Sequence, residues 1–553
     1  MKKQLLVSLI LCMPLMAAAQ YKSEVWCPDN GNGTYTNPVI NADYSDPDVC
    51  VGPSGEDYYM TASSFQCIPG LPILHSCDLV NWEIVGYAIK DKLYAGHPQL
   101  IEHFNTPRHG DGVWAPSIRY HDGQYYIYWG DPDFGVFMVK TKDGDPAGEW
   151  TDPLLVIEGK GYIDTTPLWD TDGRCYMVNG WANSRAKFAS VLTVREMSAD
   201  GTRPIGQPVI VFDGNGTENR TCEGPKFYKR DGWYWIMCPA GGVPTGFQLA
   251  MRSKSPYGPY EHKIVLAQGK TKINGPHQGA WVHTKYGEDW FIHFQDKEAY
   301  GRVVHLNPVD WSTGWPIMGN KGEPVTRFRK PLTANLSPLT VNPVESDEFN
   351  DVTLGKQWQW QANYDEKFGV PTAFGTFRIY THKLAENAKN LWLVPNMLLQ
   401  KTPADEFTVT TKLRFTSKAD GQMGGLIMMG LDYQALVVKR VGKEFQLFKL
   451  TCHKADKGTP QDEELIATLK PTAEDKIDYK PGIHEDIYLM MKVKDSQVKF
   501  AWSRDGKTYK SCGDAFKMRE GKWIGAKFGY VCVETDAKAD RGWIDADWIR
   551  ISK

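Results

Sequence analysis

The chain repeats one short pattern five times before residue 330. Each repeat places a polar or aromatic residue eleven to thirteen positions ahead of an aromatic residue, and a Gly-containing turn separates two apolar runs. Two apolar runs split by such a turn predict a β-hairpin. The hairpins recur about every 50 to 70 residues, a period typical of β-propellers. The five pairs are Asp46 and Tyr58, Trp114 and Tyr125, Asp164 and Tyr176, Glu223 and Tyr234, and His277 and Trp290.

A propeller would bring the first residue of each pair to one place. Its blades radiate from a central channel, so residues that begin the innermost strands meet at one mouth of that channel. Three of the five are carboxylates, namely Asp46, Asp164 and Glu223. Hydrolysis of a glycosidic bond uses two carboxyl groups, one protonated and one ionised. The repeats therefore predict a glycosidase site.

A single Asp ahead of a strand is usually a turn or cap residue, and we interpret Asp43 and Asp48 in that way. The three carboxylates above differ because they occupy equivalent positions in three repeats. Glu223 is surrounded by apolar residues, and a carboxyl group in such surroundings keeps its proton to higher pH, as a general acid requires. Asp164 as a neighbour would strengthen that effect by like-charge repulsion.

Residues 1–19 have the organisation of a secretory signal peptide. Lys2 and Lys3 precede an apolar segment, and Ala17 to Ala19 form a small-residue cleavage site. Bulky Leu11 before Cys12 disfavours lipoprotein processing. No later run approaches the 18 or so apolar residues of a membrane helix. The sequence predicts a periplasmic or secreted protein without membrane insertion.

The composition bears on which class of molecule this protein could bind. Without Lys2 and Lys3, 61 basic residues stand against 66 acidic ones, a net charge of −5. This balance, with no long basic run, argues against a nucleic-acid partner. The 20 Trp, 26 Tyr and 22 Phe suit stacking on sugar rings, although a core also absorbs aromatic side chains.

The cysteines give no metal-binding motif. Ten remain after the signal peptide, and none shows the CxxC spacing of zinc or thioredoxin-like sites. Export permits disulfides, and Cys67 with Cys77 is one conceivable pair.

About 530 mature residues exceed one hydrophobic core, so two or more domains are expected. We place a propeller at residues 20–330, a Pro-rich linker at 331–346 and a second domain at 347–553. The second domain has eight or more long alternating segments, typical of a two-sheet, lectin-type sandwich.

Several residues of the second domain are candidates for binding. Trp358, Trp360 and Trp392 fit either sugar binding or packing, and packing is favoured. Asp347 and Asp547 lie where lectin-like sandwiches hold calcium.

Six runs in fixed order resemble glycoside hydrolase family 43: NPVINADYSDPDV, VWAPSIRY, GYIDTTPLW, TCEGPKFY, GPHQGAWV and HFQDKEAYGRVVHLNPVDW. The resemblance covers nearly the whole mature chain. It implies an all-β fold, a five-bladed β-propeller followed by a concanavalin-like β-sandwich, and an inverting hydrolase of terminal pentosides. One departure is the run Asp164-Thr165-Thr166-Pro167, where many relatives have Asp-Pro-Ser.

The resemblance implies a role for each matching position. Asp46 would be the general base, Glu223 the general acid, and Asp164 the residue that tunes and orients the acid. Trp114 would line the pocket, and Arg302 would reach the sugar hydroxyls. Other lining candidates are Phe65, Phe134, Trp181 and Phe247.

His277 matches a histidine that in many relatives approaches a calcium ion near the propeller axis through water. It equally fits a packed, hydrogen-bonded residue. The chemistry itself would require no cofactor, and such an ion would be structural or electrostatic.

The expected function is that of an exo-acting α-L-arabinofuranosidase on plant polysaccharide side chains of the xyloglucan or arabinoxylan type. A β-D-xylosidase of the same family is the alternative, because no single residue separates the two sugars. Inversion predicts roughly 6.5–9.5 Å between the carboxyl groups of Asp46 and Glu223, against about 5–5.5 Å for retention.

Two other classes fit less well. A non-catalytic carbohydrate-binding protein would lack one of the acids, and none is missing. A β-fructosidase would carry Asn-Asp-Pro-Asn, where this chain has Ser45-Asp46-Pro47-Asp48. The oligomeric state stays open.

Overall fold

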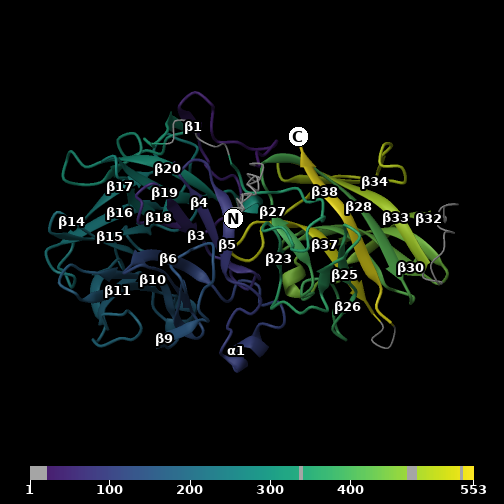
Figure 1. Ribbon diagram of the computed structural model, residues 1–553, viewed down its shortest axis with the longest axis horizontal. Helices are drawn as coiled ribbons and strands as arrows, with labels where there is room; N and C mark the ends of the chain where they lie inside the picture. Colours follow the sequence, from purple (N-terminus) through teal and green to yellow (C-terminus); the bar gives the residue numbers. More distant parts are fainter. Residues whose placement is uncertain (1–20, 335–340, 470–482, 536–539) are drawn as a thin grey trace, which may run out of the picture.

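The computed structural model describes residues 21–334, 341–469, 483–535 and 540–553. The signal peptide expected at residues 1–19 and part of the expected linker lie outside these residues. Two bodies lie side by side, one of five small sheets in purple to teal and one of two large sheets in green to yellow (Figure 1). The described helices are α1 (Pro98–His103), α2 (Asn183–Ala186), η1 (Glu298–Tyr300) and η2 (Ala455–Lys457).

Each sequence repeat forms one four-stranded antiparallel sheet, with its strands in chain order. The inner strands of the first four blades contact one another in turn. The inner strand of the fifth blade packs against the second strand of the fourth and lies beside the inner strand of the first. The five-bladed propeller predicted from the repeats is confirmed. The first blade consists of β2 (Asp48–Val51), β3 (Tyr58–Thr61), β4 (Gly70–Ser76) and β5 (Glu83–Ile89). The second consists of β6 (Trp114–His121), β7 (Gln124–Asp131), β8 (Gly135–Lys140) and β9 (Leu154–Glu158), and the third of β10 (Tyr162–Trp169), β11 (Cys175–Trp181), β12 (Val191–Met197) and β13 (Val209–Asp213). The fourth consists of β14 (Lys226–Arg230), β15 (Trp233–Ala240), β16 (Phe247–Ser253) and β17 (Glu261–Ala267), and the fifth of β18 (His277–His283), β19 (Asp289–Asp296), β20 (Arg302–Asp310) and β21 (Ile317–Met318).

The ring is fastened where the domain begins and ends. Strand β1 (Thr34–Thr36) pairs with β22 (Arg327–Arg329), and Ile40 bridges Val304 of the fifth blade. The Asn37 side chain donates hydrogen bonds to the carbonyl oxygens of Leu306 and Val325 at 2.8 and 2.7 Å. These contacts join the first residues of the propeller to its last blade.

The second domain is a sandwich of two sheets, which confirms the lectin-like fold. The two sheets enclose one core that includes Phe407, Leu426, Leu489, Tyr530 and Ile544. In the first sheet the order is β23 (Gln359–Trp360), β27 (Leu398–Lys401), β37 (Lys527–Glu534), β29 (Met423–Met429), β30 (Tyr433–Val441), β31 (Glu444–Cys452) and β32 (Asp462–Leu469), with β26 (His382–Lys383) beside β37. In the second it is β24 (Gly369–Pro371), β25 (Phe377–Tyr380), β38 (Trp543–Ser552), β28 (Glu406–Ser417), β33 (Ile483–Lys494), β34 (Gln497–Ser503) and β35 (Lys510–Ser511), with β36 (Phe516–Lys517) beside β34.

The two domains share hydrophobic and backbone contacts. Ile68 of the propeller and Trp360 of the sandwich exchange backbone hydrogen bonds of 3.1 and 2.6 Å. Tyr300 of the propeller packs into the hydrophobic core of the sandwich. Trp358 and Trp360 are only 1% and 4% exposed, so the packing role favoured for them is confirmed. Trp392 stacks on His109 of the propeller at 3.8 Å between ring centroids.

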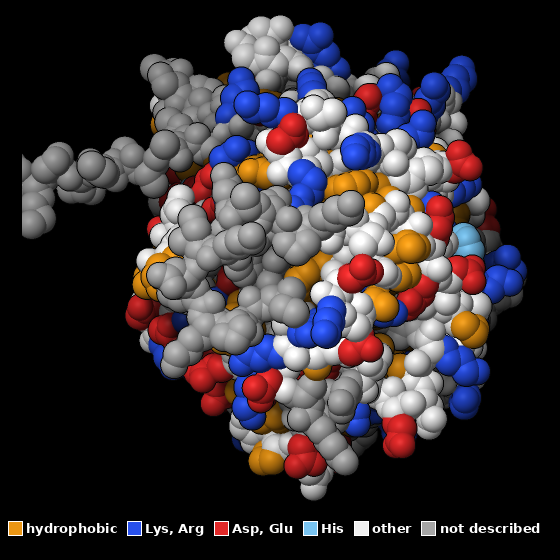
Figure 2. All heavy atoms as spheres, turned by 90° about the vertical axis from the view of Figure 1, so that its right-hand side faces the viewer, with side chains coloured by type: hydrophobic (Ala, Val, Ile, Leu, Met, Phe, Trp, Pro, Cys, Tyr) orange, Lys and Arg blue, Asp and Glu red, His pale blue; other side chains and the backbone are white. Residues whose placement is uncertain are grey.

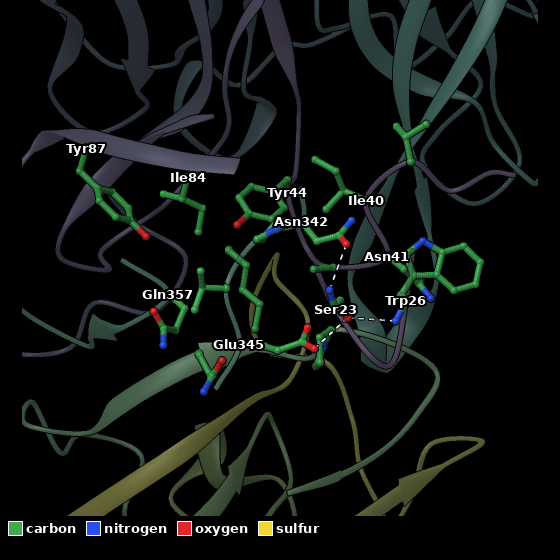
Figure 3. Close-up of a pocket in the computed structure, with 17 residues that line it drawn as sticks. Ser23, Trp26, Ile40, Asn41, Tyr44, Ile84, Tyr87, Asn342, Glu345 and Gln357 are labelled. Atoms are coloured by element: carbon green, nitrogen blue, oxygen red, sulfur yellow. Dashed lines mark hydrogen bonds between the residues drawn. The ribbon is translucent and has the colours of Figure 1, made fainter. Parts of the chain in front are cut away.

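A small interdomain cavity lies beside the N-terminal segment (Figure 3). Its volume of about 50 Å³ suits a water molecule or two rather than a sugar. Ser23 donates its hydroxyl proton to Glu345 at 2.8 Å, and its backbone N–H to Asn342 at 3.1 Å. Burial raises the pKa of Glu345 to about 7. The last residues of the expected linker are thus packed against the start of the chain.

All ten cysteines of the described residues are free thiols. Cys67 and Cys77 flank opposite ends of β4, so the pairing considered for them is wrong. Cys67 is buried at the domain interface, where the Lys527 ammonium donates to its sulfur at 3.1 Å.

The face of the sandwich turned away from the propeller carries both charges among its described residues. Lys and Arg side chains are the more frequent along its upper edge, and acidic, basic and hydrophobic side chains are mixed below it (Figure 2). Among the described helices, none has the length and apolar character needed to cross a membrane.

Candidate active site

The mouth of the propeller is the end of the channel at which the innermost strands begin. In every blade a residue with left-handed backbone stands there, two positions before the regular ladder in the first four blades and one position before it in the fifth. The φ angles are 57° at Asp46, 38° at Ala115, 58° at Asp164, 60° at Gly224 and 37° at Gln278. The ladders of β6, β10 and β18 are irregular at this point. Each blade therefore makes the same sharp bend before its strand enters the channel.

The bends show that the first residues of the five sequence pairs do not all occupy the same position in their blades. Asp46 and Asp164 occupy the left-handed position itself, whereas Trp114, Glu223 and His277 precede it by one residue. The expectation of equivalent positions is therefore wrong by one residue. The left-handed conformation tolerates Asp better than most residues because its short polar side chain bonds locally.

Asp46 is held from two sides. The Ser63 hydroxyl donates to Oδ2 at 2.6 Å, and the Arg302 guanidinium donates to Oδ1 at 3.3 Å. Ser63 also accepts the Ala115 backbone N–H at 2.7 Å, which ties this support to the second blade. Both carboxyl oxygens are thus fixed by protein groups, and the side chain has one orientation.

Arg302 is itself positioned by the first and last blades. Its backbone N–H donates to Asp43 Oδ1 at 2.8 Å, and its guanidinium lies 4.8 Å from the centre of the Phe294 ring. Asp43 is only 2% exposed. It is a buried support for Arg302 and not the turn residue that we expected.

Asp164 and Glu223 form a close carboxyl pair. The Gly224 backbone N–H donates to Asp164 Oδ2 at 2.8 Å. A Cβ atom on Gly180 would lie 3.5 Å from Asp164 Oδ2 and 3.8 Å from Glu223 Cα, so both residues approach one glycine. Burial, followed by the charge of Glu223, raises the pKa of Asp164 to about 7. Asp164 therefore keeps its proton close to neutral pH, because its ionisation beside a second carboxyl group is unfavourable.

His277 is fully buried beside this pair. Its Nε2 lies 3.0 Å from Glu223 Oε1 and restrains that carboxyl group. Its Nδ1 is buried without a protein hydrogen-bond partner. Calcium prefers six to eight oxygen ligands, so an ion at this nitrogen would be held chiefly by water. The calcium ion implied by the resemblance stays a prediction.

A buried ion pair lies two residues further along the innermost strands. Lys226 donates to the Pro116 carbonyl oxygen at 3.0 Å, and its Nζ is 3.9 Å from Asp48 Oδ1. Asp48 Oδ2 accepts from the Ile118 backbone N–H at 2.7 Å and from Arg119 at 2.6 Å. The turn role expected for Asp48 is wrong, because it links three blades below the carboxylates.

Aromatic side chains from both domains flank the mouth. Phe65 is buried 6.4 Å from the partly exposed Trp114, measured between ring centroids. Trp523 of the sandwich lies 6.0 Å from Trp114 on the other side, and half of its surface is exposed. Trp181 ends β11 at the same end of its blade, with its ring 4.6 Å from Tyr162.

The sandwich loop that carries Trp523 forms one wall of a cleft. The cleft has a volume of about 410 Å³, and Arg302 lies on its propeller wall. The loop is anchored by the Ala526 backbone N–H, which donates to the Ala299 carbonyl oxygen at 2.8 Å. Sequence reasoning did not find Trp523, Ser63 or Lys226. Only Lys226 left a signal, a lysine at the start of an apolar strand.

The other aromatic candidates stand at the mouth end of their blades and pack against neighbouring side chains. Phe134 packs against His103 and Tyr94, and Phe247 packs in the core of the fourth blade. In the sandwich, Asp347 accepts from the Trp358 indole at 2.8 Å, and Asp547 pairs with Lys412 at 2.5 Å. These two carboxylates are engaged by protein groups, and the calcium role considered for them stays a prediction.

Comparisons with known proteins give matches for both domains. Residues 35–316 match the family model "Glycosyl hydrolases family 43", and residues 346–552 match "Beta xylosidase C-terminal Concanavalin A-like domain". A provisionally named beta-xylosidase of Xylanibacter ruminicola is 35% identical over 527 residues, 93% of this chain and 88% of its own. The non-reducing end alpha-L-arabinofuranosidase BoGH43B of Bacteroides ovatus is 29% identical over 445 residues, 76% of this chain and 78% of its own.

A solved structure shows the same fold. The xylan beta-1,4-xylosidase from Bacillus halodurans C-125 superposes with a TM-score of 0.79 at 21% identity, covering 94% of this chain and all of its own.

Proposed function

Because the chain belongs to glycosyl hydrolase family 43, as the sequence resemblance indicated, we propose that it is an exo-acting, inverting β-D-xylosidase for plant-derived xylo-oligosaccharides. The observation that carries this proposal is the meeting of Asp46, Asp164 and Glu223 at one mouth, each held by named protein groups. A sugar-binding protein without activity would need no such set of supported acids.

Each carboxyl group has a distinct task in the proposed reaction. Asp46, fixed by Ser63 and Arg302, accepts a proton from the water that attacks the anomeric carbon. Glu223, held by His277, gives its proton to the departing glycosidic oxygen. Asp164 keeps that proton on the pair close to neutral pH, because ionising both acids is unfavourable.

The preference for xylose rests on relatives. The 35% identical relative has a beta-xylosidase name, and the family model matched by the sandwich is described by the same activity. This reverses the order expected from the sequence, where an α-L-arabinofuranosidase came first. That second candidate keeps support from the Bacteroides ovatus arabinofuranosidase at 29% identity.

A panel of nitrophenyl pentosides tests the substrate. We expect turnover of the β-D-xyloside and release of xylose from xylobiose. Activity on the α-L-arabinofuranoside alone would select the second candidate. Proton NMR of the first product tests inversion, and initial release of the retained β-anomer of xylose would refute it.

The shared proton predicts a specific pH dependence. We expect kcat/KM to fall above about pH 7, as the Asp164–Glu223 pair loses its proton. The Asp164→Asn variant removes the repelling charge, so this alkaline limb should move to lower pH. Exposed Asp172→Asn in the same blade is the control.

Stability gives a second readout of the same shift. The pKa of Asp164 is raised in the folded protein, so its stabilising contribution is complete below its unfolded value of 3.8 and is lost as the pH rises through about 7. The Asp164→Asn variant should therefore melt at a higher temperature than the natural protein at pH 8 but not at pH 4. Equal differences at both pH values would contradict the shift.

The cleft wall predicts how the chain binds oligosaccharides. The half-exposed Trp523 ring is placed to stack on the sugar next to the cleaved one. We expect Trp523→Ala to lower kcat/KM on xylotriose roughly twofold to tenfold, the equivalent of about 0.5–1.5 kcal/mol for one aromatic contact. Phe374→Ala, at an exposed aromatic elsewhere on the sandwich, should change nothing.

A further inference from the structure

A second group of reactive side chains lies on the first blade, at the end away from the mouth. Asp57 precedes β3, His75 is near the end of β4, Cys77 follows β4, and Glu83 begins β5. Because these strands run antiparallel, the four positions meet at one end of the blade, while Ser63 and Asp46 lie at the opposite end. The proposed hydrolysis uses none of the four.

The distances are those of an assembled ligand set. His75 Nε2 lies 2.8 Å from Asp57 Oδ1 and 3.9 Å from Cys77 Sγ, and the three atoms all lie within 4.8 Å of one another. Zinc bonds of about 2.0–2.1 Å to nitrogen and about 2.3 Å to sulfur in a tetrahedron separate ligand atoms by roughly 3.3–3.6 Å. Small side-chain movements would therefore accommodate the ion. Among the described residues, no other group of three such side chains meets this condition.

The groups around these ligands match those that orient a metal site. Glu83 Oε1 lies 3.6 Å from His75 Nδ1, so a small turn of its side chain would let it accept the proton of that nitrogen and leave Nε2 as the ligand atom. The Ser54 hydroxyl donates to Asp57 Oδ2 at 2.7 Å and leaves Oδ1 facing His75. All three ligand residues are partly exposed, so an ion can enter from solvent.

The cluster brings two carboxylates close to one imidazole. Asp57 Oδ1 lies 2.8 Å from His75 Nε2, and Glu83 Oε1 lies 3.6 Å from His75 Nδ1. A divalent ion would bind here once the imidazole and the thiol give up their protons.

We propose that Asp57, His75 and Cys77 bind one zinc ion, with water as the fourth ligand and Glu83 orienting His75. Thiolate, imidazole and carboxylate together select zinc over calcium or magnesium, which take oxygen ligands. The ion would join the start of β3 to the end of β4. No CxxC motif reveals the site, because its ligands come from two strand ends.

Titration of the full metal-free chain with zinc chloride in a calorimeter tests the proposal. We expect one ion per chain. Cys77→Ser and His75→Asn should each abolish binding or weaken it at least tenfold, and Glu83→Gln should weaken it about 10–100-fold while leaving all three ligands in place. Cys27→Ser, at another partly exposed cysteine bonded only to a backbone carbonyl oxygen, should bind as the natural protein does.

Cobalt(II) serves as a spectroscopic probe of the same site. A thiolate-to-cobalt charge-transfer band in the near ultraviolet should appear with the natural protein and with Cys27→Ser, and should be absent with Cys77→Ser. Zinc binding unchanged in Cys77→Ser, or a cobalt spectrum without that band, would overturn the proposal. Both readouts are independent of glycosidase activity, so they leave the proposed function untouched.

Discussion

Replacing Glu223 with Gln is expected to lower kcat on xylobiose about 10²–10⁴-fold, because an amide cannot protonate the departing oxygen. The loss should be much smaller on 4-nitrophenyl β-D-xyloside, whose leaving group departs without a proton. Gln has nearly the same shape as Glu, so its carbonyl oxygen can keep the contact with His277. Steady-state kinetics on the two substrates measure both effects.

The control for this variant is Glu218→Gln, an exposed position in the loop that precedes the acid. It should have the kinetics of the natural protein on both substrates. Xylobiose binding to Glu223→Gln, measured by calorimetry, should stay within a few fold. A variant that hydrolyses xylobiose at the natural rate would remove Glu223 from the role of acid.

A loss of about 10²–10⁴-fold is likewise expected for Asp46→Asn, since an amide accepts no proton from the attacking water. Here both substrates should be affected equally, because activation of water does not depend on the leaving group. Asn tolerates the left-handed backbone of Asp46 at φ 57°, so the bend at the mouth should survive.

A matched control exists in Asp122→Asn, which replaces an exposed Asp with φ 46° in the second blade. Asp46→Ala with added azide gives an independent check. Azide attacking from the face that water uses should form the glycosyl azide of inverted configuration, detectable by NMR. Because azide would give this inverted product whether the lost carboxylate was a base or a nucleophile, the natural protein makes the distinction. A retained first product from the natural protein would mean that Asp46 acts as a nucleophile and not as a base.

The propeller could be predicted from the sequence because every blade repeats the same order of apolar runs and turns. Apolar runs and Gly turns recur at propeller spacing, and the carboxylates stand at the starts of strands. The backbone conformation at the mouth could not be predicted from the sequence. Ser-Asp-Pro and Glu-Gly-Pro both place a carboxylate one or two residues ahead of a proline, but the left-handed residue is Asp46 in one and Gly224 in the other. Side-chain identity alone does not fix which residue takes that conformation.

The supports of the site were hidden for a different reason. Ser63 reaches Asp46 from the next strand, Lys226 spans the channel to Pro116, and Trp523 arrives from the other domain. Such contacts depend on how the blades and the sandwich dock. Spacing along the chain does not encode them, and an ordinary serine, lysine or tryptophan gives no local signal.

The shared core of the two domains bears on how this chain could be recombined with others. Cutting after the propeller would expose Tyr300 and the backbone groups of Ile68, and would leave the Lys527 partner of Cys67 behind. It would also remove Trp523 from the cleft wall. A sandwich taken from another protein would have to reproduce all of these interdomain contacts. The two domains are therefore expected to be inherited and exchanged together.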